Sequence, residues 1–389
     1  MKDYTSSYTL IDNDKSVVCV RCILDTTVPE ISFNKKGVCN FCTKHDKLLQ
    51  HYPQEDQLRK SKFEKLISKI KKSKKNNYNV IVGLSGGVDS SFTLHKAVEA
   101  GLKPLAVYFD NGWGADIAVK NIQKLTKKLN VDLFTYVVDW EEFKDIQKAF
   151  LKASVPCVDI PTDLAISSVL YKAAAKENIK YILSGASFIT EGTVPKSWSF
   201  IDGTYLKNIY KKYGTKKIKK YPLIDLKSIF YYTFIKKIIQ IPFTNYFHYD
   251  KKEAKKFLID QYKWEDYGGH HYENIYSKWG FGWYTYHKFG FDKRKVSLSG
   301  PIRMGKMERR EALNVTAYPP DVNEEITAFV MKKLDITKEE FKEIMEQECR
   351  SYKDFKTGLE TLNKFKFIVK IAVKNGLITP VVYEKFFDE

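Results

Sequence analysis

Four short apolar runs, separated by longer stretches with helical spacing, recur between residues 80 and 185. The runs expected to form β-strands are residues 80–82, 105–109, 131–138 and 180–183. Helical spacing follows the first run, over residues 90–100, and precedes the last, over residues 162–178. Strands that alternate with helices predict an α/β fold with a doubly wound parallel sheet, whose ligands bind at the carboxyl ends of the strands. From residue 205 onward the pattern is mainly helical and aromatic, and residues 324–346 are typical of amphipathic helices.

A loop rich in serine and glycine joins the first predicted strand to its helix, with the sequence Ser85-Gly-Gly-Val-Asp-Ser-Ser91. Such a turn points free backbone N–H groups at phosphate, and glycines let phosphate oxygens approach the main chain. The loop is not a Walker A sequence, and the complete string disfavours the alternative of a simple capped helix. Asp89 falls in the first helical turn, where the helix dipole favours a carboxylate that can also hold a metal ion. The expected nucleotide-binding residues of the loop are Ser85, Gly86, Gly87, Asp89, Ser90 and Ser91.

Further candidate residues follow the other predicted strands. Asp110 and Gly185 stand at the carboxyl ends of the second and fourth strands, where Ser85 also falls, and both are expected to contact nucleotide. Glu191 and Lys196 come shortly after the fourth strand, and Lys196 could meet charge that develops on phosphate. Taken alone, Glu191 and Lys196 would be ordinary loop residues.

Four of the six cysteines form one pattern, Cys19-x-x-Cys22 followed by Cys39-x-x-Cys42. Paired Cys-x-x-Cys turns point two sulfur atoms each at one ion, and two turns complete the tetrahedron that Zn²⁺ prefers. Four protein ligands leave no open position, so the predicted zinc site is structural. Disulfides or redox pairs are the alternatives, and they are disfavoured in a chain without a signal peptide. His45 follows the last of these cysteines and is expected to be a surface residue.

Composition and charge narrow the function classes. The chain has 389 residues, of which 43% are hydrophobic and 14% aromatic, which excludes disordered and collagen-like proteins. Its formal net charge of +18 indicates either an anionic partner or lysine-rich solvated faces. No stretch resembles a membrane span, and the first residues lack an apolar signal core. A cytoplasmic protein is therefore expected.

Two stretches of the C-terminal half combine glycines with chemically active side chains. The stretch from Trp264 to Glu273 contains two adjacent histidines and resembles a site loop, although the histidines could equally be exposed or capping residues. Basic residues gather around glycines between residues 289 and 309, which suits a phosphate group, while the start of a solvated amphipathic helix is the alternative.

These motifs resemble those of a known enzyme superfamily and of one family within it. The loop that begins at Ser85 is similar to the signature of PP-loop ATP pyrophosphatases, and the chain as a whole resembles the N-acetyl sugar amidotransferases of lipopolysaccharide O-antigen and related surface-sugar biosynthesis. The stretches that carry the resemblance are Cys19-Val-Arg-Cys22-Ile-Leu-Asp-Thr-Thr, Gly37-Val-Cys-Asn-Phe-Cys42, Ser85-Gly-Gly-Val-Asp-Ser90, Trp264-Glu-Asp-Tyr-Gly-Gly-His-His-Tyr-Glu273 and Phe289-Gly-Phe-Asp-Lys-Arg294. The family has a lysine where this chain has His270, so His271 is the better candidate of the pair.

The resemblance implies a sheet of the adenine nucleotide alpha hydrolase-like type and an ATP-dependent, AMP-forming reaction. The acetamido oxygen of an N-acetyl sugar, expected to be nucleotide-linked, would attack the α-phosphorus of ATP, and ammonia would then displace AMP to leave an acetamidino group. Mg²⁺ and basic residues would offset charge on the departing pyrophosphate. The catalytic residues implied are Asp89, Glu191, Lys196 and His271.

Ammonia is mostly protonated at neutral pH, so a glutaminase should deliver it. Residue 2 is lysine, which excludes an N-terminal cysteine nucleophile, and Cys157 lacks the glycine turn of the other glutaminase class. We therefore expect a separate glutaminase subunit of the class I type used in histidine biosynthesis, with a cyclase-like protein as a further candidate partner.

A tRNA-modifying PP-loop enzyme is the main alternative, because a zinc ribbon, a PP-loop and basic charge also describe tRNA thiolases. Nucleic acid is an expected partner only under this alternative. Thiolases generally need paired cysteines or an iron–sulfur cluster in the catalytic domain, whereas Cys157 and Cys349 are far apart in this sequence. A non-catalytic scaffold is a second alternative, which the intact loop disfavours. The expected regions are a zinc ribbon at 1–52, a PP-loop domain at 53–204 and a mainly helical region for substrate or partner binding at 205–389.

Overall fold

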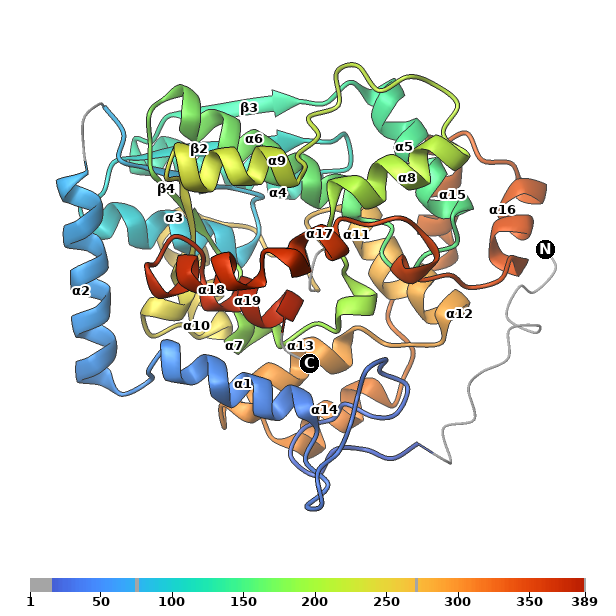
Figure 1. The fold of residues 1–389 in the computed structure, drawn as a ribbon, viewed down its shortest axis with the longest axis horizontal. Helices are drawn as coiled ribbons and strands as arrows, with labels where there is room; N and C mark the ends of the chain where they lie inside the picture. The colour runs from blue at the N-terminus through green and yellow to red at the C-terminus, as the bar shows by residue number, and fades with distance from the viewer. Residues whose placement is uncertain (1–15, 74–76, 270–271, 388–389) are drawn as a thin grey trace.

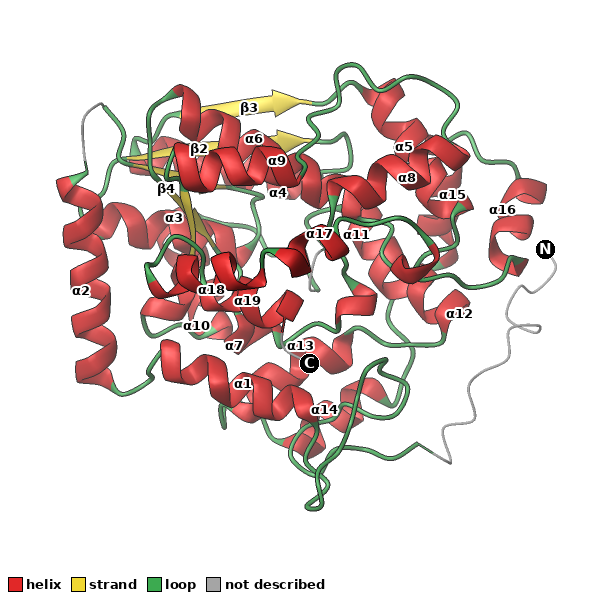
Figure 2. Ribbon diagram, in the orientation of Figure 1, coloured by secondary structure: helices red, strands yellow, loops and turns green. Residues whose placement is uncertain are grey.

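A parallel β-sheet forms the centre of the fold in the computed structural model, which describes residues 16–73, 77–269 and 272–387 (Figures 1 and 2). Within these residues the sheet has five strands in the order β3-β2-β1-β4-β5. The strands are β1 (Val80–Gly83), β2 (Pro104–Asp110), β3 (Leu133–Val137), β4 (Tyr181–Ser184) and β5 (Ile239–Pro242). The predicted doubly wound α/β fold is confirmed. The fifth strand was not predicted, and it lies in the region expected to be mainly helical, beyond residue 204. The predicted boundaries of the three regions stay predictions.

Strand β1 lies at the centre of the sheet and is covered on both faces. Its register pairs Ile81 with Leu105 of β2 on one side and with Ile182 of β4 on the other. Ile81 belongs to one hydrophobic core, and its neighbours Val80 and Val82 belong to the other, as the two-residue period of a strand requires. Burial on both faces explains why this strand is a continuous apolar run in the sequence.

Helices cover both faces of the sheet (Figure 2). The core on one face contains residues from helices α5 (Trp140–Lys152), α6 (Ile160–Lys176) and α8 (Gly203–Tyr213). The core on the other face is built from α2 (Asp56–Lys72), α3 (Val88–Glu99), α4 (Asp116–Leu129) and α10 (Lys251–Tyr262). Packing on both sides leaves the carboxyl ends of the strands as the place where loops can form a site.

The C-terminal region is mainly helical, as expected. Its remaining helices are α9 (Leu226–Phe230), α11 (Ile275–Trp279), α12 (Thr285–Phe289), α13 (Arg294–Arg303), α14 (Arg309–Thr316), α15 (Glu324–Lys333), α16 (Lys338–Glu346), α17 (Leu359–Lys364), α18 (Lys366–Lys374) and α19 (Pro380–Phe387). The amphipathic stretch 324–346 is divided at Asp335, whose φ of 51° is left-handed, and Thr337 caps the second helix. None of the helices described has both the length and the apolar character needed to cross a membrane.

The N-terminal region consists of irregular loops followed by helix α1 (Asn40–His51). Two isolated bridges, Val18 with Asp25 and Phe33 with Cys39, fold the loops back on themselves. In Figure 1 this blue segment lies beside the orange helices α13 and α14, so the N-terminal loops pack against the C-terminal half of the chain. A short helix, α7 (Phe188–Glu191), packs against α13 and connects this side to the end of β4.

Candidate active site and metal centre

Hydrogen bonds between two of its serines stabilise the loop after β1, and the conformation of the loop requires a glycine at residue 86. Gly86 has a left-handed φ of 81°, and a Cβ atom on it would lie 2.3 Å from the carbonyl oxygen of Ala118. The hydroxyl groups of Ser85 and Ser90 lie 3.1 Å apart, and the backbone N–H of Ser85 donates to the hydroxyl of Ser90. Ser91 is fully buried beneath the loop. The turn therefore exposes main chain and two hydroxyl groups at the N-terminus of α3, an arrangement that suits phosphate.

A cavity of about 410 Å³ opens at the carboxyl ends of β1, β2 and β4. The predicted site residues that line it are Ser85, Gly87, Asp89, Ser90, Gly185 and Glu191. Gly86, Ser91, Asp110 and Lys196 are not among its lining residues. The Oδ1 atom of Asp110 accepts a hydrogen bond from the backbone N–H of Gly112 at 2.9 Å, and the next residue, Asn111, lines the cavity instead. His270 and His271 lie outside the described residues.

The carboxylate of Asp89 is held by two side chains from the C-terminal half. The hydroxyl of Tyr249 donates to its Oδ1 at 2.6 Å, and Lys251 Nζ pairs with its Oδ2 at 2.7 Å. Burial alone would lower the pKa of Lys251, but the charges of Asp89, Glu191 and Glu273 outweigh burial and raise that pKa. Lys251 is therefore an ammonium group among the carboxylates of the cavity, and it is well placed to meet phosphate oxygens.

The described residues of the stretch from Trp264 to Glu273 contribute to the cavity wall. Trp264 Nε1 donates to the carbonyl oxygen of Gly86 at 3.2 Å, and the backbone N–H of Val88 donates to the hydroxyl of Tyr267 at 3.2 Å. Glu273 and Tyr267 both line the cavity. The stretch thus fixes the loop from outside, and a Cβ on Gly87 would come within 3.2 Å of both side chains.

Gly185 brings the end of β4 into contact with the start of α3. A Cβ at Gly185 would lie 2.8 Å from the backbone carbon of Asp89. Thr244 holds the same segment, because its hydroxyl donates to the carbonyl oxygen of Gly185 at 3.1 Å. The strand order reverses between β1 and β4, so Ser85 and Gly185 flank the topological switch point where such folds bind ligands.

The loop, the ammonium group and the carboxylates that line the cavity fit a nucleoside triphosphate with a bound magnesium ion. Mg²⁺ is commonly held by one or two carboxylates together with phosphate oxygens and water. Asp89, Glu191 and Glu273 line the cavity and could supply those carboxylates. Among the residues that the structure describes, the ligand atoms of three or more His, Cys, Asp or Glu side chains come close together only in the cysteine cluster.

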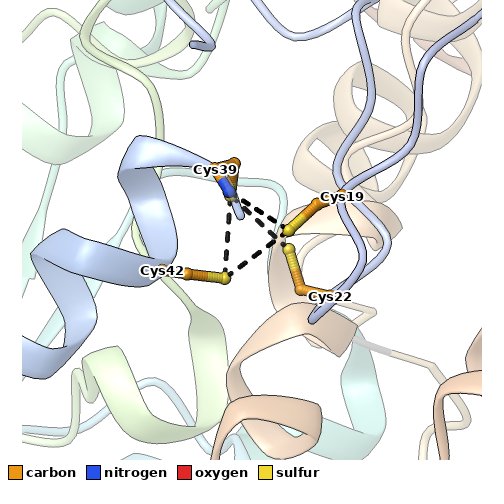
Figure 3. A group of neighbouring side chains, drawn as sticks. All are labelled: Cys19, Cys22, Cys39 and Cys42. Carbon is orange, nitrogen blue, oxygen red and sulfur yellow. Dashed lines mark hydrogen bonds between the residues drawn. The ribbon is translucent and has the colours of Figure 1, made fainter. Parts of the chain in front are cut away.

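Cys19, Cys22, Cys39 and Cys42 converge, as predicted (Figure 3). The sulfur atoms lie 3.9 Å apart in Cys19 and Cys42, 3.7 Å apart in Cys22 and Cys39, and 3.6 Å apart in Cys39 and Cys42. A zinc ion with bonds of about 2.3 Å sets tetrahedral sulfur atoms roughly 3.8 Å apart, whereas a disulfide holds them at about 2.0 Å. The cluster therefore fits one tetrahedral ion, and the disulfide alternative is wrong because all four cysteines are free.

Two arginines attach the cysteine cluster to the C-terminal region. Arg303, only 7% exposed, donates from Nε to Cys42 Sγ at 3.2 Å and from Nη2 to Cys22 Sγ at 3.4 Å. Burial would lower the pKa of Arg303, but the neighbouring sulfurs outweigh burial and raise it. Arg309 donates to the backbone carbonyls of Cys22 and Cys19 at 3.0 and 3.1 Å. The basic residues expected to bind phosphate in this stretch therefore include two that hold the cysteine cluster.

His45 is buried, and its predicted surface position is wrong. Its side chain is fully covered, because the ring packs edge-on against Phe188, with centroids 5.2 Å apart, and lies against the sulfur of Met304. Burial, followed by the charge of Arg303, lowers the pKa of His45 to about 4. The sequence could not show that α7 and α13 cover this face of α1.

The fold and site define the chain as an α/β protein with a serine- and glycine-rich turn at the switch point of its parallel sheet and a separate four-cysteine centre. Residues 273–370, about a quarter of the chain, match the family described as LPS biosynthesis protein WbpG-like, C-terminal domain. The chain is thus similar to that family over this segment. No curated protein matches the chain.

Several solved structures have weak overall likeness to the chain. The NH3-dependent NAD synthetase from Campylobacter jejuni is 21% identical, covers 34% of this chain and has a TM-score of 0.27, and the chain spans 57% of its length. NMN synthetase from Francisella tularensis is 16% identical over 52% of this chain and 86% of its own, with a TM-score of 0.27. The U34-tRNA thiolase NcsA from Methanococcus maripaludis is 12% identical over 76% of this chain and 88% of its own, with a TM-score of 0.34. The α/β fold is defined by the strand order of the sheet and by the position of the loop after β1.

Proposed function

We propose that the chain is an ATP-dependent, AMP-forming amidotransferase of surface-sugar biosynthesis that converts the acetamido group of an N-acetyl sugar into an acetamidino group. The observation that carries the proposal is the cavity at the switch point, where the loop after β1, the ammonium group of Lys251 and several carboxylates meet. The similarity of residues 273–370 to a lipopolysaccharide biosynthesis domain supports the pathway class. The resemblance of the motifs to N-acetyl sugar amidotransferases supports the reaction.

In this proposal the loop and the first turn of α3 bind the β- and γ-phosphates of ATP. Their free backbone N–H groups and the hydroxyls of Ser85 and Ser90 act as donors. Lys251 offsets charge on the departing pyrophosphate, and Asp89 and Glu191 are the candidates to hold Mg²⁺. The catalytic roles of Lys196 and His271 and the nucleotide contact of Asp110 remain predictions from the sequence.

An amide carbon is a poor electrophile, and adenylation makes it reactive. The acetamido oxygen attacks the α-phosphorus of ATP, the bond from that phosphorus to pyrophosphate breaks, and an O-adenylated imidate forms. Ammonia then adds to the imidate carbon, AMP leaves with the former acetamido oxygen, and loss of a proton gives the neutral amidine. Water must be kept from the imidate, which suits a site between the sheet and the C-terminal helices.

Ammonia would come from a separate glutaminase subunit. A glutaminase nucleophile must be reached by glutamine, yet Cys157 is buried, and burial raises the pKa of its thiol. Cys349 is exposed, but desolvation raises the pKa of its thiol, which donates to the carbonyl oxygen of Lys288, so the reactive thiolate is disfavoured. These environments support a chain that lacks its own glutaminase. The four-cysteine centre is proposed to hold structural Zn²⁺, with all four ligands supplied by the chain.

The decisive experiment is mass spectrometry of UDP-linked N-acetyl sugars incubated with the chain, ATP, Mg²⁺ and ammonium. We expect AMP and a product one mass unit lighter, in which NH replaces oxygen, and no product with glutamine alone. Asp89→Ala should abolish the product, whereas Asp116→Ala, in the exposed first turn of α4, should not. Salt-dependent binding of tRNA with adenylated tRNA as the product would replace this proposal by the tRNA-modifying alternative.

A further inference from the structure

A second group of polar side chains lines the same cavity, and it comes from α6 and α11 rather than from the phosphate loop. Its members, together called the α6–α11 wall, are Asp159, Thr162, Asp163, Asn274 and Ser277. Phe281, which follows α11, adds an aromatic ring to the lining. None of these residues was a candidate from the sequence.

Asp159 occupies the N-cap position of α6 but does not cap the helix. An aspartate at this position normally accepts from a backbone N–H one turn on, yet the backbone of Asp159 is helical, with φ −92° and ψ 0°, and its side chain makes no cap hydrogen bond. Its Oδ2 instead accepts from the hydroxyl of Ser277. Its Oδ1 has no hydrogen-bond partner among the described residues, although the side chain belongs to a residue only 5% exposed.

A buried carboxylate oxygen without a donor is costly, and the charge of the buried Lys293, which acts on Asp159 and Asp163, offsets only part of that cost. Asp159 lines the cavity, but its Oδ1 is itself covered, so a donor of a molecule bound there reaches this oxygen only after a small movement of the side chain. Phosphate has no hydrogen to donate when ionised and is repelled by Asp159 and Asp163. The group expected beside Asp159 is therefore a neutral or cationic donor, and not a second part of the triphosphate.

The rest of the wall is held in place by a chain of hydrogen bonds. Asn274 Nδ2 donates to Asn111 Oδ1 at 3.3 Å, and the backbone N–H of Ser277 donates to Asn274 Oδ1 at 3.0 Å. Asn111 Nδ2 in turn lies 3.5 Å from the hydroxyl of Thr162. The ammonium group of Lys293 lies over the ring of Phe281, with Nζ 3.8 Å from the ring centre. These contacts fix a polar surface beside an aromatic ring before any ligand arrives.

We propose that the α6–α11 wall binds the hydroxyl groups of the acceptor sugar, and that Asp159 determines specificity for them. A carboxylate, amide and hydroxyl groups beside an aromatic ring match the alternating hydroxyl and C–H surfaces of a pyranose. The placement in the cavity of the phosphate loop would bring the acetamido group to the α-phosphorus. The inference rests on the proposed function and adds the site that selects its acceptor.

The test is calorimetric binding of UDP-N-acetylglucosamine and UDP-N-acetylgalactosamine to the full, metal-loaded chain in saturating AMP-PNP and Mg²⁺. At least one sugar should bind, and Asp159→Asn should weaken its binding roughly tenfold or more, because a charged acceptor is lost. Ser277→Ala should weaken binding less. The affinity for AMP-PNP should stay within about twofold in both variants.

Thermal unfolding separates this role from a structural one. Asp159→Asn should lower the melting temperature only slightly, since the side chain caps no helix and asparagine can still accept the hydrogen bond from the hydroxyl of Ser277. Asp225→Ala is the control: Asp225 caps α9 through the backbone N–H of Ser228 and does not line the cavity, so its replacement should lower the melting temperature without affecting sugar binding.

The inference is overturned if neither sugar binds the unchanged chain, or if Asp159→Asn binds sugar as tightly as the unchanged chain. It is also overturned if Asp159→Asn changes only the KM for ammonium, which would make the wall an ammonium site. Failure of the proposed function has a different result: nucleotide and sugar would bind, yet no AMP or lighter product would form.

Discussion

Replacing Arg303 by methionine would test what holds the four-cysteine centre to the rest of the protein. The guanidinium is buried and donates to the sulfurs of Cys42 and Cys22, and its Nη1 has no partner among the described residues. Four thiolates around one divalent ion carry a net charge of −2, so a buried cation beside two of them lowers the electrostatic cost of the loaded centre. Methionine preserves much of the side-chain volume and removes only the charge and the donors.

The expected magnitude follows from removing one partner of a buried charge pair, which costs about 3 to 5 kcal/mol. Sulfur is a weaker acceptor than oxygen and the contacts are 3.2 and 3.4 Å long, so the lower value, about 3 kcal/mol, is appropriate. That corresponds to a metal affinity about two powers of ten weaker. In the metal-free protein with protonated thiols, the same replacement should cost far less, because the buried arginine then has no anionic partner.

The assay is competition for Zn²⁺ between the protein and a coloured chelator at fixed pH. Arg310→Met is the matched control, because Arg310 is exposed, whereas its neighbour Arg309 holds the backbone of the cysteine loops. Arg303→Met should lose the metal at much lower chelator concentration than Arg310→Met. Equal metal retention in the two variants, or equal destabilisation of the loaded and metal-free forms by Arg303→Met, would refute the reasoning.

The remaining predictions concern the nucleotide cavity and pH. Lys251→Met should weaken ATP binding by tenfold or more in calorimetry, because it removes the ammonium group and leaves Asp89 without its cationic partner, whereas Lys252→Met should have little effect. Gly185→Ala should reduce ATP binding at least as strongly, because its Cβ would lie 2.8 Å from the α3 backbone. Burial lowers the pKa of His45 to about 4 in the folded protein, whereas in the unfolded chain its pKa is about 6.5. As the pH falls below about 6.5, the unfolded chain therefore binds a proton at His45 that the folded protein does not bind. Stability measured by urea unfolding should therefore be complete above that pH and fall by about 2 kcal/mol at pH 5, and His45→Leu should lack this loss.

The central part of the site was accessible from the sequence because its residues are contiguous. A buried strand, a glycine turn and a helix lie within one short segment, and local sterics alone place Ser85, Gly87 and Ser90 at a helix N-terminus. The metal centre was accessible for the same reason, since each Cys-x-x-Cys turn is local and two turns share one ion. Residue type and spacing were sufficient in both cases.

Other features depended on contacts between distant parts of the chain. Lys251 and Tyr249 meet Asp89 across about 160 residues, and no local pattern marks a lysine or a tyrosine that will do so. Strand β5 is short and lies in a helical region, and its pairing with β4 decides its conformation. Asp159 resembled an ordinary helix cap in sequence, and only its backbone angles and the position of Ser277 turn it toward the cavity.

The sequence by itself determined the parallel sheet, the phosphate loop and the four-cysteine centre, because each arises from short-range periodicity, turn geometry or ligand spacing. Tertiary structure decided which charges share the cavity, where Arg303 finds its sulfurs and why His45 is buried. The physical reason is that charge pairing and burial depend on distance in space and on the surrounding dielectric, and neither quantity is encoded by the neighbours of a residue along the chain.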